Sequence, residues 1–260
     1  MTKTIAVHSY RGGTGKTLVA VNLAGIFVSK GRNVCLMDLD FRAPSLYSVF
    51  NLGRQPFYLN DFFDGACGFK DVLVDVTQRY AVKGRFLVAP ADPDMEAIQK
   101  YTLKDRRWEM GVLRRLLSLK SSFFEDAGVD YVLLDTSPGI QYSSINAIVG
   151  SDLTIIVTSL DKSDLEGTRK MLSQFIDVFE KKALILANKV VGGNLGQLQS
   201  VVKNKFVSEL SASFSARVLE AIPCYCDVLG SGGRKIFSLE TPDHPLVKVL
   251  ASVAETLDGL

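Results

Sequence analysis

The hydrophobic residues of this chain follow two alternating patterns. One pattern consists of short, nearly continuous apolar runs, which are typical of central parallel strands covered on both faces. The other consists of longer segments in which apolar residues recur at helical spacing. The runs that predict strands are residues 4–9, 33–40, 85–90, 129–135, 153–159, 182–189 and 216–223.

Segments with helical spacing lie between the predicted strands. Gly31 ends the first of these segments, and residues 51–85 have the weakest pattern of either kind. The alternation predicts one α/β domain over residues 1–260, with a doubly wound, mostly parallel sheet and helices on both faces. The segments with helical spacing are residues 17–30, 105–124, 164–179 and 195–210. A closing helix is predicted to bury Leu246, Val249, Leu250, Val253 and Leu257.

Composition narrows the possible compartments and partners. The 260 residues are 47% hydrophobic and 22% charged, as in an ordinary globular protein. A net charge of +2 gives no global attraction to nucleic acid or to acidic membranes. The four cysteines are too few for a disulfide scaffold, and the amino terminus has no long apolar run. We therefore expect reduced thiols and a cytoplasmic location.

The segment SYRGGTGKTL, residues 9–18, carries the main chemical signal. It follows the first predicted strand and opens the first predicted helix, which is the context of a phosphate-binding loop. Lys16 is expected to reach the β- and γ-phosphates of a nucleotide, and the Thr17 hydroxyl to bind Mg²⁺. Tyr10 stands where the usual pattern has its first glycine. Backbone N–H groups are expected to surround the phosphates at Gly12, Gly13, Thr14 and Gly15.

Arg11 adds a second cation beside a loop in which Lys16 already serves the phosphates. The stretch RGGTGKT resembles the deviant Walker A motif K-G-G-x-G-K-[ST] of the MinD/ParA family of dimerising ATPases. The first lysine of that motif crosses a face-to-face dimer and touches the partner's phosphates, so the resemblance implies this role for Arg11. Arginine is a planar fork rather than a point charge, which is a departure from the motif. Leu18 is another departure, because the family often has a hydroxyl residue there, near the α-phosphate.

Two further segments resemble the switches of this family, and the resemblance covers nearly the whole chain. In DLDFRAPSL it places Asp38 near the magnesium shell and Asp40 where a carboxylate orients the attacking water. The residues alone are also compatible with two strand-end caps, but the loop favours the functional interpretation. In VDYVLLDTSPG it places Asp135 at the magnesium ion, partly through water, and lets Pro138 and Gly139 sense the γ-phosphate.

The base of the nucleotide is expected near the end of a later strand. An amide at the carboxyl end of LILANK can pair with the edge of adenine, and the resemblance assigns this role to Asn188. An asparagine turn is the alternative. The stretch AIPCYCDV resembles the family segment whose loop packs along the adenine, which adds Pro223 and Cys224.

The resemblance implies ATP and Mg²⁺ as cofactors, with in-line attack of water on the γ-phosphate. Lys16, Asp40 and Arg11 would be the catalytic residues. A homodimer would form with ATP and respond to an activating partner protein. The expected role is spatial organisation, such as placement of the division site or partitioning of DNA or cargo.

Two surfaces are candidates for larger partners. MinD-like members end in a basic amphipathic helix on the membrane, but here the last helix has one lysine, Lys248, and the chain ends at Leu260, which speaks against such an anchor. ParA-like members bind DNA without sequence preference, and a basic face is predicted opposite Met110, Leu113 and Leu117. Its cations are Lys104, Arg107, Arg114 and Arg115. A solvated outer face is the more ordinary interpretation.

Other functions remain open on the sequence. Some relatives carry a metal or an Fe–S cluster between two subunits, and Cys224 and Cys226 form a C-x-C, although a reduced pair fits their position better. DLDFRAPSL also resembles a stretch of bacterial tyrosine kinases, whose tyrosine-rich tail this chain lacks. Because of Arg11, a nucleotide-bound scaffold with slow turnover also stays possible.

Overall fold

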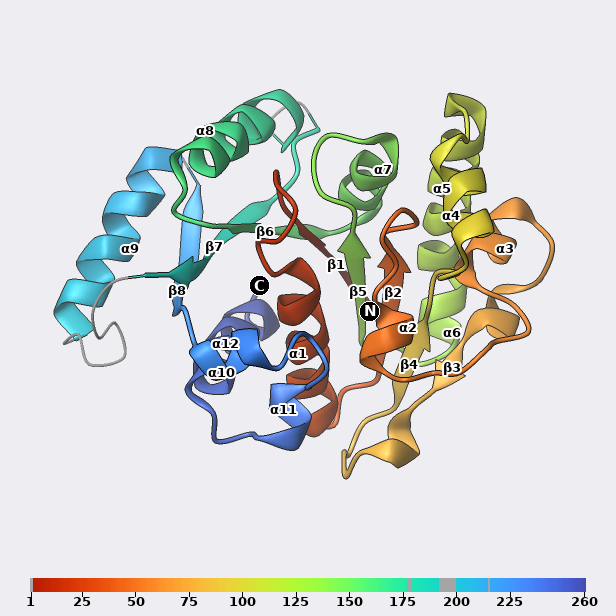
Figure 1. Cartoon of the computed structure of the whole chain (residues 1–260), viewed down its shortest axis with the longest axis horizontal. Coiled ribbons are helices and arrows are strands. Elements are labelled where there is room, and N and C mark those ends of the chain that lie inside the picture. The colour runs from red at the N-terminus through yellow and green to blue at the C-terminus, as the bar shows by residue number, and fades with distance from the viewer. Residues whose placement is uncertain (1, 177–178, 192–199, 215) are drawn as a thin grey trace.

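A twisted sheet runs through the middle of the molecule in the computed structural model (Figure 1). The structure describes residues 2–176, 179–191, 200–214 and 216–260. Eight strands form the sheet within these ranges. They are β1 (Lys3–His8), β2 (Val34–Leu39), β3 (Val74–Asp75), β4 (Phe86–Ala89), β5 (Tyr131–Thr136), β6 (Leu153–Thr158), β7 (Ala183–Val190) and β8 (Arg217–Pro223).

The order of the strands is β3-β4-β2-β5-β1-β6-β7-β8. All seven strands predicted from apolar runs are present, and each pairs in parallel with its neighbours among them. The short strand β3 pairs antiparallel with β4 at one edge. It lies in the segment 51–85, whose pattern is the weakest. The predicted doubly wound, mostly parallel fold is therefore confirmed.

Helices connect the strands, with short 3₁₀ turns at Phe69–Val72 and Thr77–Arg79 and π turns at Leu119–Phe123 and Leu172–Ile176. The predicted helix 105–124 comprises α5, one π turn and α6, and the predicted helix 164–179 comprises α8 and the second π turn. Residues 177, 178 and 195–199 of the predicted helices lie outside the described residues. The helices are α1 (Lys16–Ser29), α2 (Leu46–Val49), α3 (Leu59–Asp64), α4 (Met95–Thr102), α5 (Arg106–Ser118), α6 (Phe124–Asp126), α7 (Tyr142–Gly150), α8 (Lys162–Met171), α9 (Ser200–Phe214), α10 (Cys226–Gly230), α11 (Phe237–Glu240) and α12 (Pro245–Asp258).

Both faces of the sheet are covered, which explains why its strands are apolar without alternation. Ile5 and Val7 point into a core shared with α1, α11 and α12, whereas Ala6 between them points into a core shared with α3 and α5. Ile156 and Ile185 pack against α8 and α9. The closing helix α12 buries four of the five residues predicted for it and Val247, while Val249 is half-buried.

Because seven of the strands pair in parallel, their carboxyl ends meet at one edge of the twisted sheet. Asp38 in β2 lies opposite Asp135 in β5, and Val7 in β1 lies beside Asp135 on its other side. In such sheets ligands bind at this edge. The fold therefore brings the loop after β1 together with the ends of β2, β5, β6 and β7.

Candidate nucleotide and magnesium site

The loop between β1 and α1 has a conformation that needs glycine. Gly13 and Gly15 have φ values of 78° and 100°, and Gly15 is the N-cap of α1. A Cβ atom on Gly15 would lie 2.3 Å from Nδ2 of Asn188. Left-handed backbone and close approach thus both exclude a larger residue at Gly15. Helix α1 begins at Lys16, one residue before the predicted segment 17–30, so its free N–H groups face the loop.

Two side chains at the end of β7 donate hydrogen bonds to carbonyl groups of this loop. Nδ2 of the buried Asn188 donates to the carbonyl of Thr14 at 2.7 Å, and Nζ of Lys189 donates to the carbonyl of Gly13 at 2.7 Å. These bonds turn the carbonyl groups of the loop toward β7. One N–H of Asn188 is therefore committed to the loop, and its predicted contact with adenine remains a prediction.

An acidic cluster lies beside Thr17. The Thr17 hydroxyl donates to Oδ2 of Asp135 at 2.6 Å and lies 3.3 Å from the Ser45 hydroxyl. Oδ1 of Asp135 is buried and has no hydrogen-bond partner among the described residues. A buried carboxylate oxygen without a partner costs free energy, and a bound cation would remove that cost.

Asp38 and Asp40 organise the segment that follows β2. Asp38 accepts hydrogen bonds from the backbone N–H groups of Ser45 at 2.9 Å, Leu46 at 3.0 Å and Asp40 at 3.1 Å. Oδ1 of Asp40 accepts from the Ser137 hydroxyl at 2.9 Å and from the N–H of Ala43 at 3.1 Å. The two aspartates therefore do cap this turn, and Asp40 also contacts the segment after β5.

The charges in this cluster perturb one another. Burial, followed by the nearby charge of Asp135, raises the pKa of Asp38, and burial raises the pKa of Asp135. Burial also lowers the pKa of Lys16, while the charges of Asp135 and Asp40 raise it. Both buried carboxyl groups therefore resist ionisation, and they lie next to the phosphate loop. A cation bound there would stabilise their charged forms.

The segment after β5 lies against the loop. The N–H of Gly139 donates to the Ser9 carbonyl at 2.9 Å, and the Pro138 ring lies 3.8 Å from where a Cβ atom on Gly12 would sit. His8, directly before the loop, is buried and bonded to the Thr136 hydroxyl at 2.7 Å. Burial and the charge of Lys16 lower the pKa of His8 to about 3, so this histidine is neutral and structural.

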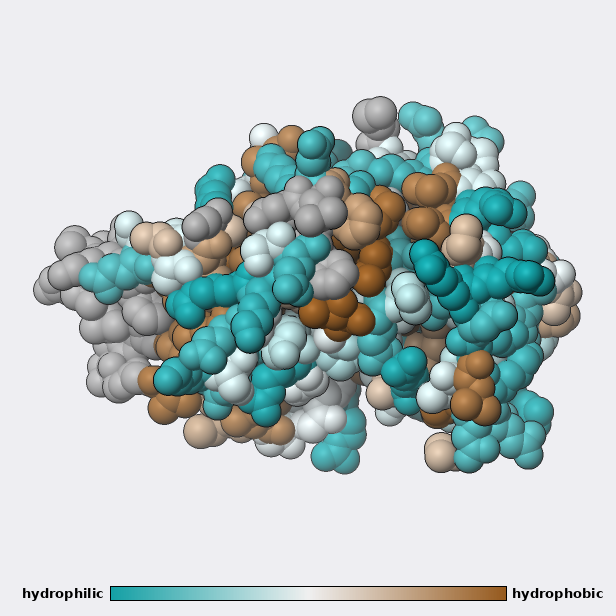
Figure 2. All heavy atoms as spheres, turned by 90° about the horizontal axis from the view of Figure 1, so that it is seen from above, coloured by the Kyte–Doolittle hydropathy of each residue, from teal (hydrophilic) through white to brown (hydrophobic). Residues whose placement is uncertain are grey.

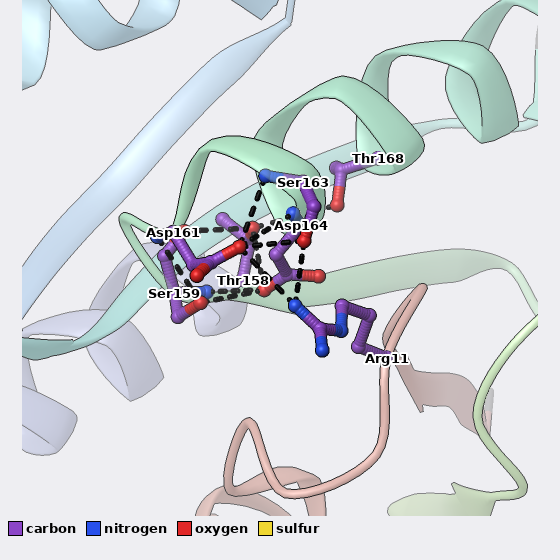
Figure 3. A network of polar contacts seen from close by, with 7 residues as sticks. All are labelled: Arg11, Thr158, Ser159, Asp161, Ser163, Asp164 and Thr168. Atoms are coloured by element: carbon purple, nitrogen blue, oxygen red, sulfur yellow. Dashed lines mark hydrogen bonds and ion pairs between the residues drawn. The ribbon is translucent and has the colours of Figure 1, made fainter.

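Arg11 lies on the start of α8 in its own subunit (Figure 3). Its Nη1 donates to Oδ1 of Asp161 at 3.1 Å and to the Ser163 hydroxyl at 2.6 Å. Asp161 is the N-cap of α8 and accepts from the backbone N–H of Ser163 at 2.9 Å. Hydrogen bonds from Ser163 and Asp164 lower the pKa of Asp161, and Arg11 adds the smallest contribution.

The residues predicted to surround the base do come together. They form a hollow of about 20 Å³, which is too small for a base. A larger hollow of about 330 Å³ shares Leu18 with it and is lined by Thr17, Ser45 and the loop 232–235. The predicted residues that line the small hollow are Leu18, Asn188, Pro223 and Cys224.

Sequence reasoning missed several polar residues of this site. Ser45 and Ser137 contact Thr17 and Asp40, Lys189 holds the loop, and Asp161 and Ser163 hold Arg11. Ser45 and Ser137 lie within the motifs DLDFRAPSL and VDYVLLDTSPG, and this position is the local signal for them. The pair at the start of α8 lies 150 and 152 residues from Arg11 and has no local signal.

The predicted basic face of α5 is wrong in its orientation. Met110 and Leu117 are 57% and 44% exposed, whereas Val112 and Leu116 are buried. The helix packs through the stripe that includes those two residues, so the assumed apolar face points outward. Two of the four predicted cations are also engaged within the chain. Nζ of Lys104 donates to Asp64 at 2.9 Å, and the guanidinium of Arg115 lies 5.5 Å from the ring centre of Phe62.

In the part of the chain that the structure describes, no three His, Cys, Asp or Glu side chains lie close enough together to hold a metal ion between them. Cys224 is half-buried and Cys226 is exposed, and both are free. Among the described residues, no helix has the length and apolar character needed to cross a bilayer.

A parallel sheet with a glycine-rich loop, a buried lysine and a threonine–aspartate pair at its carboxyl edge defines a P-loop nucleotide-binding protein. The chain belongs to the AAA domain family, which matches residues 2–189. It is similar to a chromosome partitioning protein ParA of Myxococcus xanthus, with 25% identity over 224 residues, or 84% of this chain and 74% of that protein. The resemblance to the MinD/ParA family is confirmed.

An uncharacterized protein of Pseudomonas putida is 28% identical over 187 residues, which is 70% of this chain and 64% of that relative. The chain thus spans less than two thirds of the length of this relative. The solved structure of septum site-determining protein MinD from Pyrococcus horikoshii, complexed with Mg-ADP, has a TM-score of 0.76 at 22% identity, covering 99% of this chain and 96% of that one.

Proposed function

We propose that this chain is a Mg²⁺-dependent ATPase of the MinD/ParA type, a single P-loop domain over residues 1–260 that dimerises when it binds ATP. The observation that carries the proposal is the contact between Thr17 and Asp135 beside an unpartnered, buried carboxylate oxygen. It lies at the start of α1, where the glycine loop ends. A hydroxyl and a carboxylate are the oxygen ligands that Mg²⁺ prefers next to phosphate.

The residues of the acidic cluster fit a magnesium ion. Thr17 and Asp135 would hold it, Asp135 partly through water, and Asp38 would lie in its outer shell. When bound, Mg²⁺ supplies positive charge to the phosphates. The raised pKa values of Asp38 and Asp135 support this assignment, because a cation would stabilise both carboxylates in their ionised form.

The loop and Lys16 would bind the phosphates. The backbone N–H groups from Gly12 to Leu18 and the start of α1 offer donors and a positive dipole end. Lys16 is 8% exposed, so it would meet a phosphate where little water screens the interaction. Asn188, Pro223 and Cys224 would surround the base once the hollow between them widens, and Leu18 would lie near the α-phosphate.

Asp40 would orient the attacking water and Arg11 would reach the phosphates of the partner subunit. Asp40 is half-buried and fixed by Ser137 and Ala43, which supports a positioning role for its carboxylate. Figure 2 shows the molecule from above the view of Figure 1, and hydrophobic side chains gather near the middle of this face. Such a patch supports contact with a second copy of the chain.

The biological role we propose is a switch in spatial organisation, either placement of the division site or partitioning of DNA or cargo, acting in the cytoplasm. The named relatives MinD and ParA support this class of role. An activating partner protein would set the rate of turnover. Non-specific DNA is the other surface expected for the protein, and the orientation of α5 does not support it.

ATP binding with and without Mg²⁺ tests the proposal directly. Wild-type protein should bind ATP by calorimetry and hydrolyse it slowly only when Mg²⁺ is present. Lys16→Ala should abolish binding at millimolar Mg²⁺, whereas Lys30→Ala, a change of the same kind at the far end of α1, should bind normally. Tight ATP binding by Lys16→Ala would contradict the site assignment.

A scaffold with slow turnover is the second candidate, and one observation favours it. Arg11 is held by α8 of its own subunit and is not free to act elsewhere without breaking that contact. Turnover that stays negligible in a proven ATP-bound dimer would support the scaffold.

A further inference from the structure

We infer that Asp161 and Ser163 hold Arg11 in a docked position that must be released before two subunits assemble around ATP. This makes Asp161 a positioning residue that sets how readily the dimer forms. The inference rests on the proposed function, because it concerns when Arg11 becomes available to a partner subunit.

The docked position and a contact across a dimer exclude each other. Nη1 of Arg11 already donates to Asp161 and to Ser163, at 3.1 Å and 2.6 Å. Both bonds use Nη1 and turn the guanidinium toward its own α8 (Figure 3), so the side chain would have to swing away from α8 to direct its donors at phosphates bound in another subunit. The side chain of Arg11 is 52% exposed, so it can leave α8 without disturbing the core.

The start of α8 is a rigid surface for this contact (Figure 3). Oδ2 of Asp164 accepts from the N–H of Ser159 at 2.7 Å, from the Ser159 hydroxyl at 2.9 Å and from the Thr158 hydroxyl at 3.2 Å. The side chain of Thr168 reaches Thr158 at 3.4 Å. Because Asp164 ties α8 to the end of β6, Asp161 keeps its place when Arg11 leaves.

A second contact brings α8 to the entrance of the loop. A Cβ atom on Gly167 would lie 2.0 Å from the ring of Tyr10, so glycine is what lets the ring lie against the helix. Tyr10 occupies the position where the usual phosphate loop has its first glycine. Its ring and the guanidinium of Arg11 therefore both lie against the first two turns of α8, and the unusual opening of the loop is explained by packing within one subunit.

The expected size of the effect follows from exposure. An ion pair as exposed as Arg11 and Asp161 shifts an equilibrium by about two- to fivefold. Each subunit of a symmetric dimer has to release its own Arg11. The shifts multiply, so losing the contact should favour the dimer by about four- to 25-fold.

The test compares Asp161→Asn with Glu166→Gln by sedimentation in the presence of Mg²⁺ and a non-hydrolysable ATP analogue. Asparagine still caps α8, so Asp161→Asn removes the charge and little else. Glu166→Gln removes the same charge from the same helix, and its carboxylate lies 4.0 Å from Lys162, away from Arg11. Asp161→Asn should dimerise about four- to 25-fold more tightly than wild type, and Glu166→Gln should match wild type.

A double-mutant cycle between Arg11→Ala and Asp161→Asn tests the docked contact separately, in nucleotide-free monomer by equilibrium unfolding. The two changes should couple, whereas Arg11→Ala and Glu166→Gln should add. Absence of coupling, or a dimer of Asp161→Asn that is equal to or weaker than wild type, would overturn the inference. If wild type dimerises but Asp161→Asn is unchanged, only the docked position fails. If neither dimerises, the proposed function fails with it.

Discussion

Replacing Gly15 by alanine should cost more free energy than the same change at Gly12 or Gly13, the other two glycines of the phosphate loop. Gly15 has φ of 100°, and a new Cβ would lie 2.3 Å from Nδ2 of Asn188. The left-handed backbone costs about 1–2 kcal/mol for a residue with a side chain. Displacing Asn188 from the Thr14 carbonyl costs a further amount of about 0.5–1.5 kcal/mol. The total is about 1.5–3.5 kcal/mol.

Gly13 and Gly12 are matched controls that separate the cost of the left-handed backbone from the cost of displacing Asn188. Gly13 has φ of 78°, but nothing lies within 4 Å of the place that a new methyl group would take, so Gly13→Ala should cost the backbone component alone, about 1–2 kcal/mol. Gly12 has no positive φ, and its nearest neighbour, the Pro138 ring, is at 3.8 Å. Gly12→Ala should therefore stay within about 0.5 kcal/mol.

This loss of free energy can appear in the stability of the fold or in the affinity for ATP. If the loop keeps its shape, the free energy of unfolding falls; if the loop relaxes in the free protein, ATP binding has to restore it and affinity falls by a factor of ten for about every 1.4 kcal/mol. Denaturant unfolding and calorimetric titration with Mg-ATP should be done on all three variants, and the two losses added. An equal total for Gly15→Ala and Gly13→Ala would refute the role of the Asn188 contact.

Two more predictions concern the base and the metal. If Asn188 acts only by holding the loop, Asn188→Ala should weaken binding of ATP and of inorganic triphosphate equally. If Asn188 also contacts adenine, the loss should be larger for ATP. Calorimetry with both ligands separates the two cases, and no loss with either ligand would contradict the contact with Thr14. Because the pKa values of Asp38 and Asp135 are raised in the folded protein, the nucleotide-free protein should lose stability as pH rises from about 4. Mg²⁺ needs both carboxyl groups ionised, so the dependence of ADP binding on Mg²⁺ should strengthen between about pH 6 and about pH 8. Asp38→Asn should flatten this trend. If the trend is flat in the wild-type protein, the electrostatic account is contradicted.

The fold was predictable because its signals are local and continuous. Each buried strand, such as β5 or β6, is an apolar run bounded by polar residues, and the loop from Gly12 to Thr17 lies within one stretch of sequence. The two-residue strand β3 gave no such signal, since its pairing with β4 depends on the edge of a sheet already formed.

The parts of the site that sequence reasoning missed depend on distant contacts. Asn188 approaches Gly15 only because β7 lies two strands from β1, and Asp161 meets Arg11 because α8 begins above the end of β6. The error on α5 has a similar origin. Met110 and Leu117 looked like a buried face, but the position of α7 and the sheet selects the stripe of Val112 and Leu116 instead.

The central claim is that two subunits complete one another's sites, and a mixture of two inactive variants tests it most directly. Arg11→Ala lacks the cation proposed to cross the interface but keeps Asp40, and Asp40→Ala has the opposite defect. In a mixed dimer the site of the Arg11→Ala subunit receives an intact Arg11 from its partner and keeps its own water-orienting carboxylate. ATP hydrolysis should therefore reappear on mixing, with one competent site in each mixed dimer. If mixed dimers form and no hydrolysis returns, or if Arg11→Ala alone is fully active, Arg11 does not act across the interface and the account is wrong at its centre.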